Sequence, residues 1–322
     1  MRSYIPLSIL PIGFVLVACG GGGSGGNSSV PHVPFTSWTA IQPNTTTVAS
    51  GSSQELSYLA NPQTDKVTSA SSVSPNQAGA QYFVTTNSNN DSSAITLKSA
   101  LGTTVTFNAA NGSALGSQYR YFSTPQTYAK YTGVLTGDGT SAALAIDPLY
   151  MGWNYQGYGV WITGRGTGSG TAGVMSIGAP TIASNVPTAG AATFSGNSAG
   201  LYLTPVGDYF ITTAAMTANV SFTNRTVNFS TTNTLAASAA TVINGNFGTS
   251  ASGLDLKGNL SYAAGSNNLN GTVTSSSSYN GNPMTGSAAG SFYGPNANEI
   301  GGTFALTGTG AESYAGAFGG KR

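Results

Sequence analysis

The sequence predicts an all-β protein, with either a sandwich or an up-and-down barrel in its C-terminal half. Short segments with an apolar side chain at every second position recur about every 8–15 residues, and clusters of Asn, Gly, Ser and Pro separate them. No segment between them shows the 3.6-residue apolar period of a helix. Aromatic residues make up 10% of the chain, which also favours strands over helices.

The alternation is sharpest from residue 188 to the end of the chain. Val220 and Phe222 share one face of an extended segment, and Val227 and Phe229 do so after a turn near Asn224, which predicts a hairpin. Glycines recur inside these segments and suit the bends of a small barrel. The expected strands are Phe210–Thr213, Ala218–Thr223, Arg225–Thr231, Val242–Phe247, Leu254–Tyr262, Leu269–Thr274, Met284–Tyr293, Glu299–Leu306 and Tyr314–Phe318.

Residues 35–187 alternate strand-like pieces with polar turns. Their densest aromatic run is Met151–Ile162, where Tyr158, Val160 and Ile162 would share one face of a strand and Trp161 the other. Such a run is more typical of a core than of a ligand site. Shorter strands are expected at Tyr82–Thr86, Ala94–Lys98, Thr103–Phe107 and Thr132–Thr136.

Trp153 and Tyr155 fall outside the apolar alternation of that run. Aromatic residues are enriched among the side chains that contribute most to protein interfaces. We therefore take Trp153 and Tyr155 as candidate partner contacts.

The first eighteen residues are typical of an export signal. Arg2 precedes an apolar stretch, Ile5–Val17, which is too short to span the roughly 30 Å of a bilayer core as a helix. Leu16-Val17-Ala18-Cys19 then resembles the bacterial lipobox, which implies cleavage before Cys19 and acylation of that residue. Two or more acyl chains hold a protein durably on a bilayer, so the sequence predicts a lipid-anchored protein.

The residues after Cys19 support this interpretation. Residues 19–34 begin with a Gly-rich run typical of a flexible tether. Cys19 is the only cysteine of the chain and cannot form an internal disulfide. Because Gly20, rather than Asp, follows it, the signal that retains many lipoproteins in the inner membrane is missing, and we expect the outer membrane.

Composition excludes several classes of partner. Charged residues make up 6% of the 322 residues, against about 25% in average soluble domains, and the formal net charge is +1. Loss of Arg2 with the signal leaves nine basic and nine acidic residues. Binding of nucleic acid or of an acidic membrane through bulk charge is therefore excluded. We expect a monomer that grips its partner by shape and aromatic contact.

The sequence offers little for catalysis or cofactor binding. Gly168–Gly173 matches G-x-G-x-x-G, but no acidic residue follows before Asp208, so we interpret it as a flexible hairpin loop. The only histidine, His32, lies in the Pro-flanked tether, and the acids are scattered without metal-ligand spacing. We expect neither an enzyme nor a metal site, and haem binding has no His or Cys ligand outside the tether to support it.

The C-terminal end carries a specific family motif. The stretch Gly290-Ser-Phe292-Tyr293-Gly294-Pro295-Asn-Ala297-Asn-Glu299-Ile300-Gly301-Gly302-Thr-Phe304 and the tail Gly316-Ala-Phe318-Gly319-Gly320-Lys321 resemble the final hairpin of transferrin-binding protein B-like barrel domains. Upstream, Tyr158–Trp161 and Val186–Gly196 resemble the pieces that lead into that barrel. The resemblance covers about residues 155–322.

The resemblance implies a single lobe of that family. It predicts an eight-stranded antiparallel up-and-down barrel at 188–322, preceded by a β-rich handle domain at 35–187. Within the motif, Gly294-Pro295 would form a turn, Phe292 and Phe304 would face the barrel interior, and Gly301-Gly302 would allow tight curvature. Glu299 completes the structural motif.

The functional expectation follows from the anchor and the resemblance together. We expect a non-catalytic surface lipoprotein of the outer membrane that binds a host or environmental protein, with iron or haem as the candidate cargo of that protein. The alternative is a structural or adhesive envelope protein with no discrete ligand, which the neutral Ser/Thr/Asn/Gly-rich composition would also suit.

Overall fold

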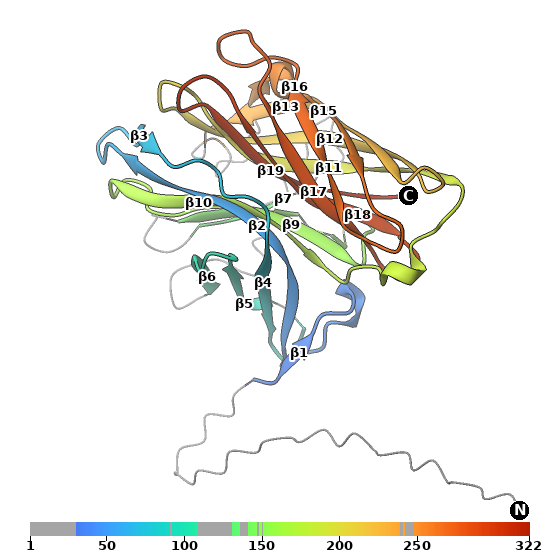
Figure 1. The fold of residues 1–322 in the computed structure, drawn as a ribbon. Coiled ribbons are helices and arrows are strands. Elements are labelled where there is room, and N and C mark those ends of the chain that lie inside the picture. The colour runs from blue at the N-terminus through green and yellow to red at the C-terminus, as the bar shows by residue number, and fades with distance from the viewer. Residues whose placement is uncertain are drawn as a thin grey trace, which may run out of the picture.

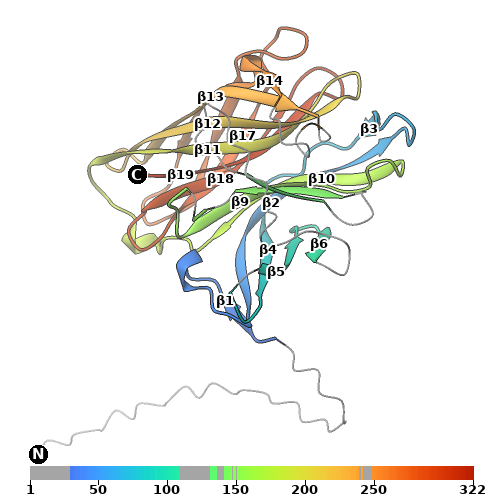
Figure 2. The same ribbon diagram turned by 180° about the vertical axis from the view of Figure 1, so that it is seen from behind.

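The computed structural model describes residues 30–90, 92–108, 131–135, 141–146, 148–149, 151–238, 241 and 248–322. They form a closed barrel and a curled sheet that lie side by side (Figures 1 and 2). The curled sheet, here called the handle, is built from the first half of the chain. Its strands are β1 (His32–Pro34), β2 (Thr46–Ala60), β3 (Val67–Ala70), β4 (Gln77–Thr86), β5 (Ser92–Lys98), β6 (Thr104–Asn108), β7 (Tyr131–Leu135), β8 (Ala142–Ile146), β9 (Gln156–Ile162) and β10 (Ser169–Gly178).

The barrel is built from eight antiparallel strands of the second half. They run in the order β12-β11-β19-β18-β17-β16-β15-β13, and pairing between β12 and β13 closes the ring, which leaves none of these strands with a free edge. The expected all-β fold with an eight-stranded antiparallel barrel is thereby confirmed. The bounds are β11 (Ala191–Leu203), β12 (Tyr209–Ser221), β13 (Thr226–Ala237), β15 (Leu256–Ser261), β16 (Leu269–Ser275), β17 (Thr285–Tyr293), β18 (Glu299–Thr307) and β19 (Ser313–Lys321), with the short β14 (Thr249–Ser250) beside β13.

Large side chains fill the barrel interior. Phe194, Phe222 and Tyr262 surround Phe292, with ring centroids 5.5–5.9 Å from its ring. Phe229 and Phe318 form a second pair, 4.6 Å apart. Because side chains alternate between the two faces of a strand, the aromatic side chains named here point into the barrel, where folding removes about 150–250 Å² of each from water.

Strand β9 of the handle is buried on both of its faces. In β9 every residue is buried, and successive side chains point to opposite sides of the sheet. Tyr158 and Val160 pack toward the barrel together with Ala199 and Ala317, whereas Trp161 packs into a separate cluster on the other face. The core character expected for this aromatic run follows from the barrel covering one face and the curl of the sheet covering the other.

Four expectations about individual segments differ from the structure or lie outside it. Phe210–Thr213 and Ala218–Thr223 are not separate strands but parts of the continuous strand β12, because the buried residues Ala214 and Met216 continue the alternation between them. The first barrel strand, β11, was missed because its Ser195–Ser198 portion carries no large apolar side chain. The expected strand Val242–Phe247 lies outside the described residues.

The fourth difference concerns Gly168–Gly173, which is only in part a hairpin loop. Gly168 ends the turn with φ +97°, but the strand β10 already begins at Ser169. Gly173 lies inside that strand. A Cβ at this position would come within 2.3 Å of the indole of Trp161, so no larger residue fits beneath the ring.

The molecule has two ends that the functional argument distinguishes. The near end contains residues 148–155, the short helices η1 (Trp38–Ala40) and η3 (Ala183–Asn185), and the barrel turns 222–225, 262–268 and 294–298, on the lower right in Figure 1. The far end contains the loops 61–66, 163–168, 204–208, 276–284 and 308–312, on the upper left. Within the described ranges, no helix has the length and apolar character needed to cross a bilayer.

Candidate functional site

The handle is fixed to the barrel at the near end by one buried carboxylate. Glu299, at the start of β18, is 1% exposed and accepts hydrogen bonds from the backbone N–H groups of Asn154, Tyr155 and Gln156, at 2.6, 2.9 and 3.0 Å. Three consecutive N–H donors form a small anion-binding concavity, here occupied by a side chain of the other domain. Burial raises the pKa of the Glu299 carboxyl, although the three N–H donors and Lys321 act to lower it.

Two glycines of the motif admit the handle against the barrel wall. The side chain of Gln156 is fully buried and lies over Gly301 and Gly319, where an added Cβ would come within 2.9 and 2.3 Å of its amide atoms. Gly302, in contrast, faces inward, and a Cβ there would meet Phe318 at 2.8 Å. Gly301 therefore serves close approach of the handle, a role that the expectation of tight curvature does not include.

The remaining motif residues lie as their pattern suggests. Phe292 and Phe304 are both fully buried in the barrel core. Gly294 begins the β17–β18 turn with φ +82°, and Pro295 follows it, exposed. An added Cβ at Gly294 would approach the ring of Tyr155 to 2.5 Å, so this turn also contacts the handle.

The two candidate partner contacts take different positions. Trp153 is 2% exposed, and its ring packs near Tyr158, with centroids 6.2 Å apart, so it belongs to the core between handle and barrel. A ring buried there presents no surface to a partner, and this corrects the expectation for Trp153. Tyr155 is half-buried against Gly294. Partner binding through Tyr155 stays a prediction.

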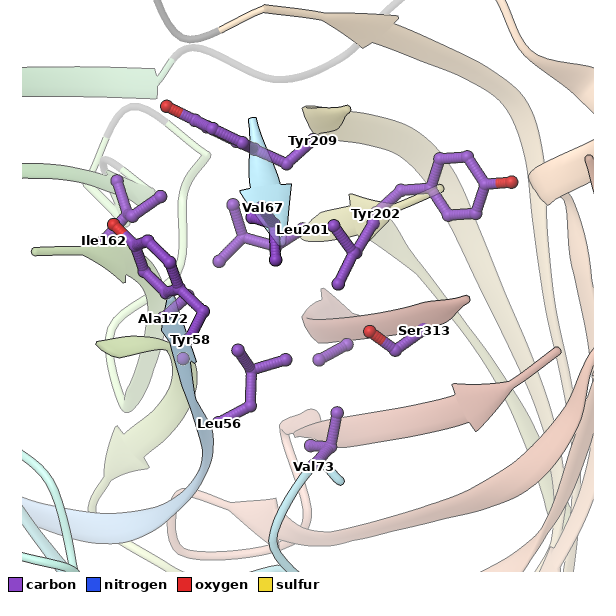
Figure 3. Close-up of a pocket in the computed structure, with 13 residues that line it drawn as sticks. Leu56, Tyr58, Val67, Val73, Ile162, Ala172, Leu201, Tyr202, Tyr209 and Ser313 are labelled. Atoms are coloured by element: carbon purple, nitrogen blue, oxygen red, sulfur yellow. The ribbon is translucent and has the colours of Figure 1, made fainter. Parts of the chain in front are cut away.

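An apolar crevice lies between handle and barrel towards the far end (Figure 3). Leu56, Val67 and Val73 of the handle side face Leu201 and Ala315 of the barrel, and the cavity between them has a volume of about 30 Å³. That volume is close to two water molecules, and its apolar walls offer water no partners. The crevice is therefore a packing seam with room for no more than a small apolar group.

The tyrosines around the crevice direct their hydroxyls elsewhere. Tyr58 donates to the carbonyl of Thr163, and Tyr202 donates to Glu312 at 2.5 Å; the hydroxyl of Tyr202 points away from the cavity in Figure 3. Burial raises the pKa of both phenols. Both phenols therefore stay neutral at physiological pH and are held by hydrogen bonds within the protein.

A polar cluster joins three hairpins above the crevice. Tyr209 donates to Asp65 at 2.6 Å, and Arg165 lies 3.9 Å from the same carboxylate. Burial, with the hydrogen bond to Asp65, raises the pKa of Tyr209 to about 12. Beside it, Lys66 and Asp208 form an ion pair at 3.1 Å that is largely exposed. The cluster couples the handle to the β11–β12 loop and so fixes the arrangement of the far-end loops.

The far end presents isolated large apolar side chains to solvent. Leu59, Val206 and Tyr279 are 54%, 52% and 57% exposed. They come from the handle, the β11–β12 loop and the β16–β17 loop, respectively. Glu312 helps to hold the last of these loops, because it accepts a hydrogen bond from the backbone N–H of Tyr279 at 2.9 Å. Both domains thus expose large apolar side chains at the far end.

Nothing in the described parts of the chain resembles a metal centre. Among these residues no group of three or more His, Cys, Asp or Glu side chains is arranged to hold a metal ion. His32 lies on β1 beside Phe83, with ring centroids 6.2 Å apart. Cys19 lies outside the described residues.

The barrel region of the chain matches the model of one protein family. Residues 186–322 match the model of the C-lobe and N-lobe beta barrels of Tf-binding protein B. The C-terminal part of the chain is thus similar in sequence to these barrels. The match begins at Val186, in the connection between β10 and β11, and spans all eight barrel strands. No curated protein matches the sequence.

Solved structures of transferrin-binding protein B show a distant likeness over most of the chain. A variant from Haemophilus parasuis is 10% identical with a TM-score of 0.43, and the match covers 85% of this chain and 76% of that one. A variant from Actinobacillus pleuropneumoniae is 13% identical with a TM-score of 0.41, and the match covers 85% of this chain and 99% of that one. The protein from Neisseria meningitidis is 12% identical with a TM-score of 0.39, and the match covers 77% of this chain and 53% of that one.

Sequence reasoning missed the junction between the two domains. The motif around Glu299 was visible as a family pattern, but nothing local indicates that the donors to its carboxylate are residues 154–156, about 145 positions earlier. Tyr279 was visible only as part of a turn cluster. A lone aromatic residue in a Ser/Asn/Gly turn is the signal that could have identified it as an exposed contact.

Proposed function

We propose that this protein is a non-catalytic, lipid-anchored lipoprotein of the outer-membrane surface that captures a protein partner through the far end. The observation that supports this most directly is the exposure of Leu59, Val206 and Tyr279 at the far end of the two domains, together with a barrel whose sequence matches that of Tf-binding protein B. Isolated aromatic and aliphatic anchors on a scaffold stabilised elsewhere are typical of interface hot spots. The low charge of the chain favours contact by shape over electrostatic capture.

The partner class we propose is transferrin or a comparable iron-carrying protein. The family whose barrel model matches residues 186–322 is named for binding transferrin. No cofactor of the chain's own enters the proposal, because a protein that captures a carrier needs surface complementarity and no redox chemistry.

Capture is tested with the soluble chain from residue 27 and iron-loaded transferrin as the first probe. We expect stoichiometric binding, and we expect Tyr279→Ala to weaken it by about tenfold or more, because truncation of an aromatic anchor typically costs over 1 kcal/mol. The measurement is surface plasmon resonance. Leu101→Ala is the matched control, since Leu101 is equally exposed, at 54%, but lies on the β5–β6 turn.

Two results would contradict this proposal. Equal weakening by Leu101→Ala would show that Tyr279 has no particular role. Failure of the unmodified chain to capture transferrin, or any stoichiometric partner from serum, would favour the passive envelope protein instead.

Anchoring is tested by Cys19→Ala. We expect the variant to move from the membrane fraction to the soluble fraction and to lose palmitate labelling, because the remaining chain has no acylated residue to insert. Cell fractionation with metabolic labelling measures both. A variant that stays membrane-bound and labelled would refute the lipid anchor.

A further inference from the structure

The near end exposes apolar side chains that no part of the described chain covers. Ile182, just before η3, is 69% exposed, more than any other large apolar side chain described, and Leu149 is 56% exposed. Both stand at connections between strands, where a soluble protein normally places polar residues. A surface that covered these two side chains would remove their apolar area from water, which favours binding.

The same end gathers exposed cations. Arg225, Lys321 and Arg322 are all exposed. The two ion pairs that the described residues form, Lys66–Asp208 and Arg165–Asp65, lie at the far end. Glu299, which pairs with Lys321 across β18 and β19, accepts hydrogen bonds from three backbone N–H groups through its carboxylate. Among the described residues of the near end, the exposed charged side chains are therefore all basic, although the whole chain is almost neutral.

Hydrogen bonds connect these side chains into one surface. Arg322 donates to the carbonyl of Asn296, and Thr181, next to Ile182, donates to the carbonyl of Gly294 in the same turn, both at 2.6 Å. Lys321 donates at 2.7 Å to Gly152, which itself bonds to Leu149. We call Leu149, Ile182, Arg225, Lys321 and Arg322 the near-end patch.

Arg225 joins this surface through the neighbouring turn. The backbone N–H of Tyr262 bonds to the carbonyl of Arg225, and Asn267, in the turn that follows Tyr262, donates to the carbonyl of Thr181 at 2.8 Å. The cations and the exposed apolar side chains therefore flank the same group of turns. The near-end patch combines the two features that bring a protein surface to a lipid interface.

The chain enters the folded part on the same side of the molecule. Residue 30 leads directly into β1, which lies below η1 and η3 in Figure 1 and again in the reversed view of Figure 2. The eleven residues from Cys19 to residue 29 can reach at most about 40 Å. An acylated Cys19 would thus hold the near-end patch within reach of the headgroups.

We propose that the near-end patch docks on anionic lipid headgroups beside the anchor, so that the far end points away from the membrane. This inference rests on the proposed lipid anchor and deepens the proposed function, because it orients the capture surface. The basic side chains would lie at the phosphate level, with Ile182 and Leu149 inserted at the headgroup boundary. The cations of the near-end patch attract the anionic headgroups at short range. The near-zero net charge of the whole chain therefore does not prevent this docking.

The test uses the mature chain with Cys19→Ala, so that no acyl chain contributes to binding. Vesicles of phosphatidylcholine with 30% phosphatidylglycerol are compared with pure phosphatidylcholine by co-sedimentation (roughly one third anionic lipid gives a strongly negative surface). We expect binding only to the anionic vesicles and a steep loss of binding when salt is raised towards 0.5 M, because exposed charges are screened.

Two variants test the patch itself. Arg225→Gln/Lys321→Gln/Arg322→Gln is expected to lower the partition coefficient by about 100-fold, since each cation near an anionic surface contributes about fivefold. Ile182→Ser/Leu149→Ser is expected to lower it with the salt dependence retained. Lys98→Gln/Lys257→Gln is the matched control, because both lysines are exposed and lie on strands away from the near end, and it is expected to bind like the parent.

The outcomes separate this inference from the proposed function. Equal binding to neutral and anionic vesicles, no binding to either, or an equal effect of the Lys98/Lys257 control would overturn the docking. Transferrin capture by the same soluble chain would be unaffected in each case. Thermal unfolding of every variant shows whether a loss of binding reflects unfolding, and the serine pair gives a second measurement if the glutamine variant is unstable.

Discussion

Replacing Gly294 with valine is expected to destabilise the protein by about 2–5 kcal/mol, measured by urea unfolding. The backbone of Gly294 has φ +82°, a conformation that costs a side chain with a Cβ roughly 1–2 kcal/mol. The added Cβ would also lie 2.5 Å from the ring of Tyr155, and overpacking of this kind adds about 1–3 kcal/mol. The β17–β18 turn and the handle would be forced apart.

Gly281→Val is the matched control for that experiment. Gly281 has the same φ of +82°, but nothing lies within 4 Å of its Cβ position, so only the backbone strain of about 1–2 kcal/mol applies. Tyr155→Ala in the Gly294→Val background should remove the clash and bring the cost close to that of the control. Equal destabilisation by the two valine substitutions would show that Gly294 does not mediate contact between handle and barrel.

Glu299→Ala is expected to cost about 3–5 kcal/mol at neutral pH, because it leaves three N–H groups of residues 154–156 without their acceptor. The handle loop should loosen first, which hydrogen exchange at Asn154, Tyr155 and Gln156 would measure. Glu312→Ala is an informative comparison, since Glu312 is equally buried at 1% exposure but bonds within the barrel and its far-end loops. Fast exchange at 154–156 in that variant as well would contradict the assigned role.

The pH dependence of stability gives a second measurement on Glu299. Burial raises its pKa above the ordinary 4.5, so the folded protein binds this proton more tightly than the unfolded chain. Its contribution to stability is therefore complete below about pH 4.5 and falls as the pH rises through the folded-state pKa. Glu299→Gln does not titrate, so the stability of the parent relative to this variant should decline over that range. A relative gain would show that the pKa is lowered.

Much of the barrel could be predicted because the types and spacing of its residues indicate which side chains are buried and which are exposed. In β17 and β18, Phe292 and Phe304 occupy positions that alternate with small or polar residues, and the period of two fixes which face is inward. The turn between them carries Gly294 at a left-handed φ, which only a few residue types adopt easily. Pattern and turn chemistry agree, and the family barrel matches the same region.

Prediction failed where small residues replaced the usual signals. β11 and the middle of β12 rely on Ala, Ser and Gly, whose burial depends on what packs against them. Ala214 and Ala218 are fully buried, yet alanine is common on surfaces and in cores alike. Trp153 was assigned to the surface for the complementary reason, since it breaks a local alternation but is covered by the barrel.

By itself the sequence determined an all-β chain with an N-terminal segment that resembles a lipobox and a barrel motif at its end, because strand periodicity, turn residues and short linear motifs are local properties. Only the tertiary structure decided what the buried carboxylate of Glu299 holds, why Gly301 and Gly319 must lack side chains, and which exposed residues share an end. Those facts depend on contacts between segments more than 100 positions apart, such as Gln156 over Gly319. Sequence spacing does not encode such distances, because they arise when two separately patterned sheets pack together.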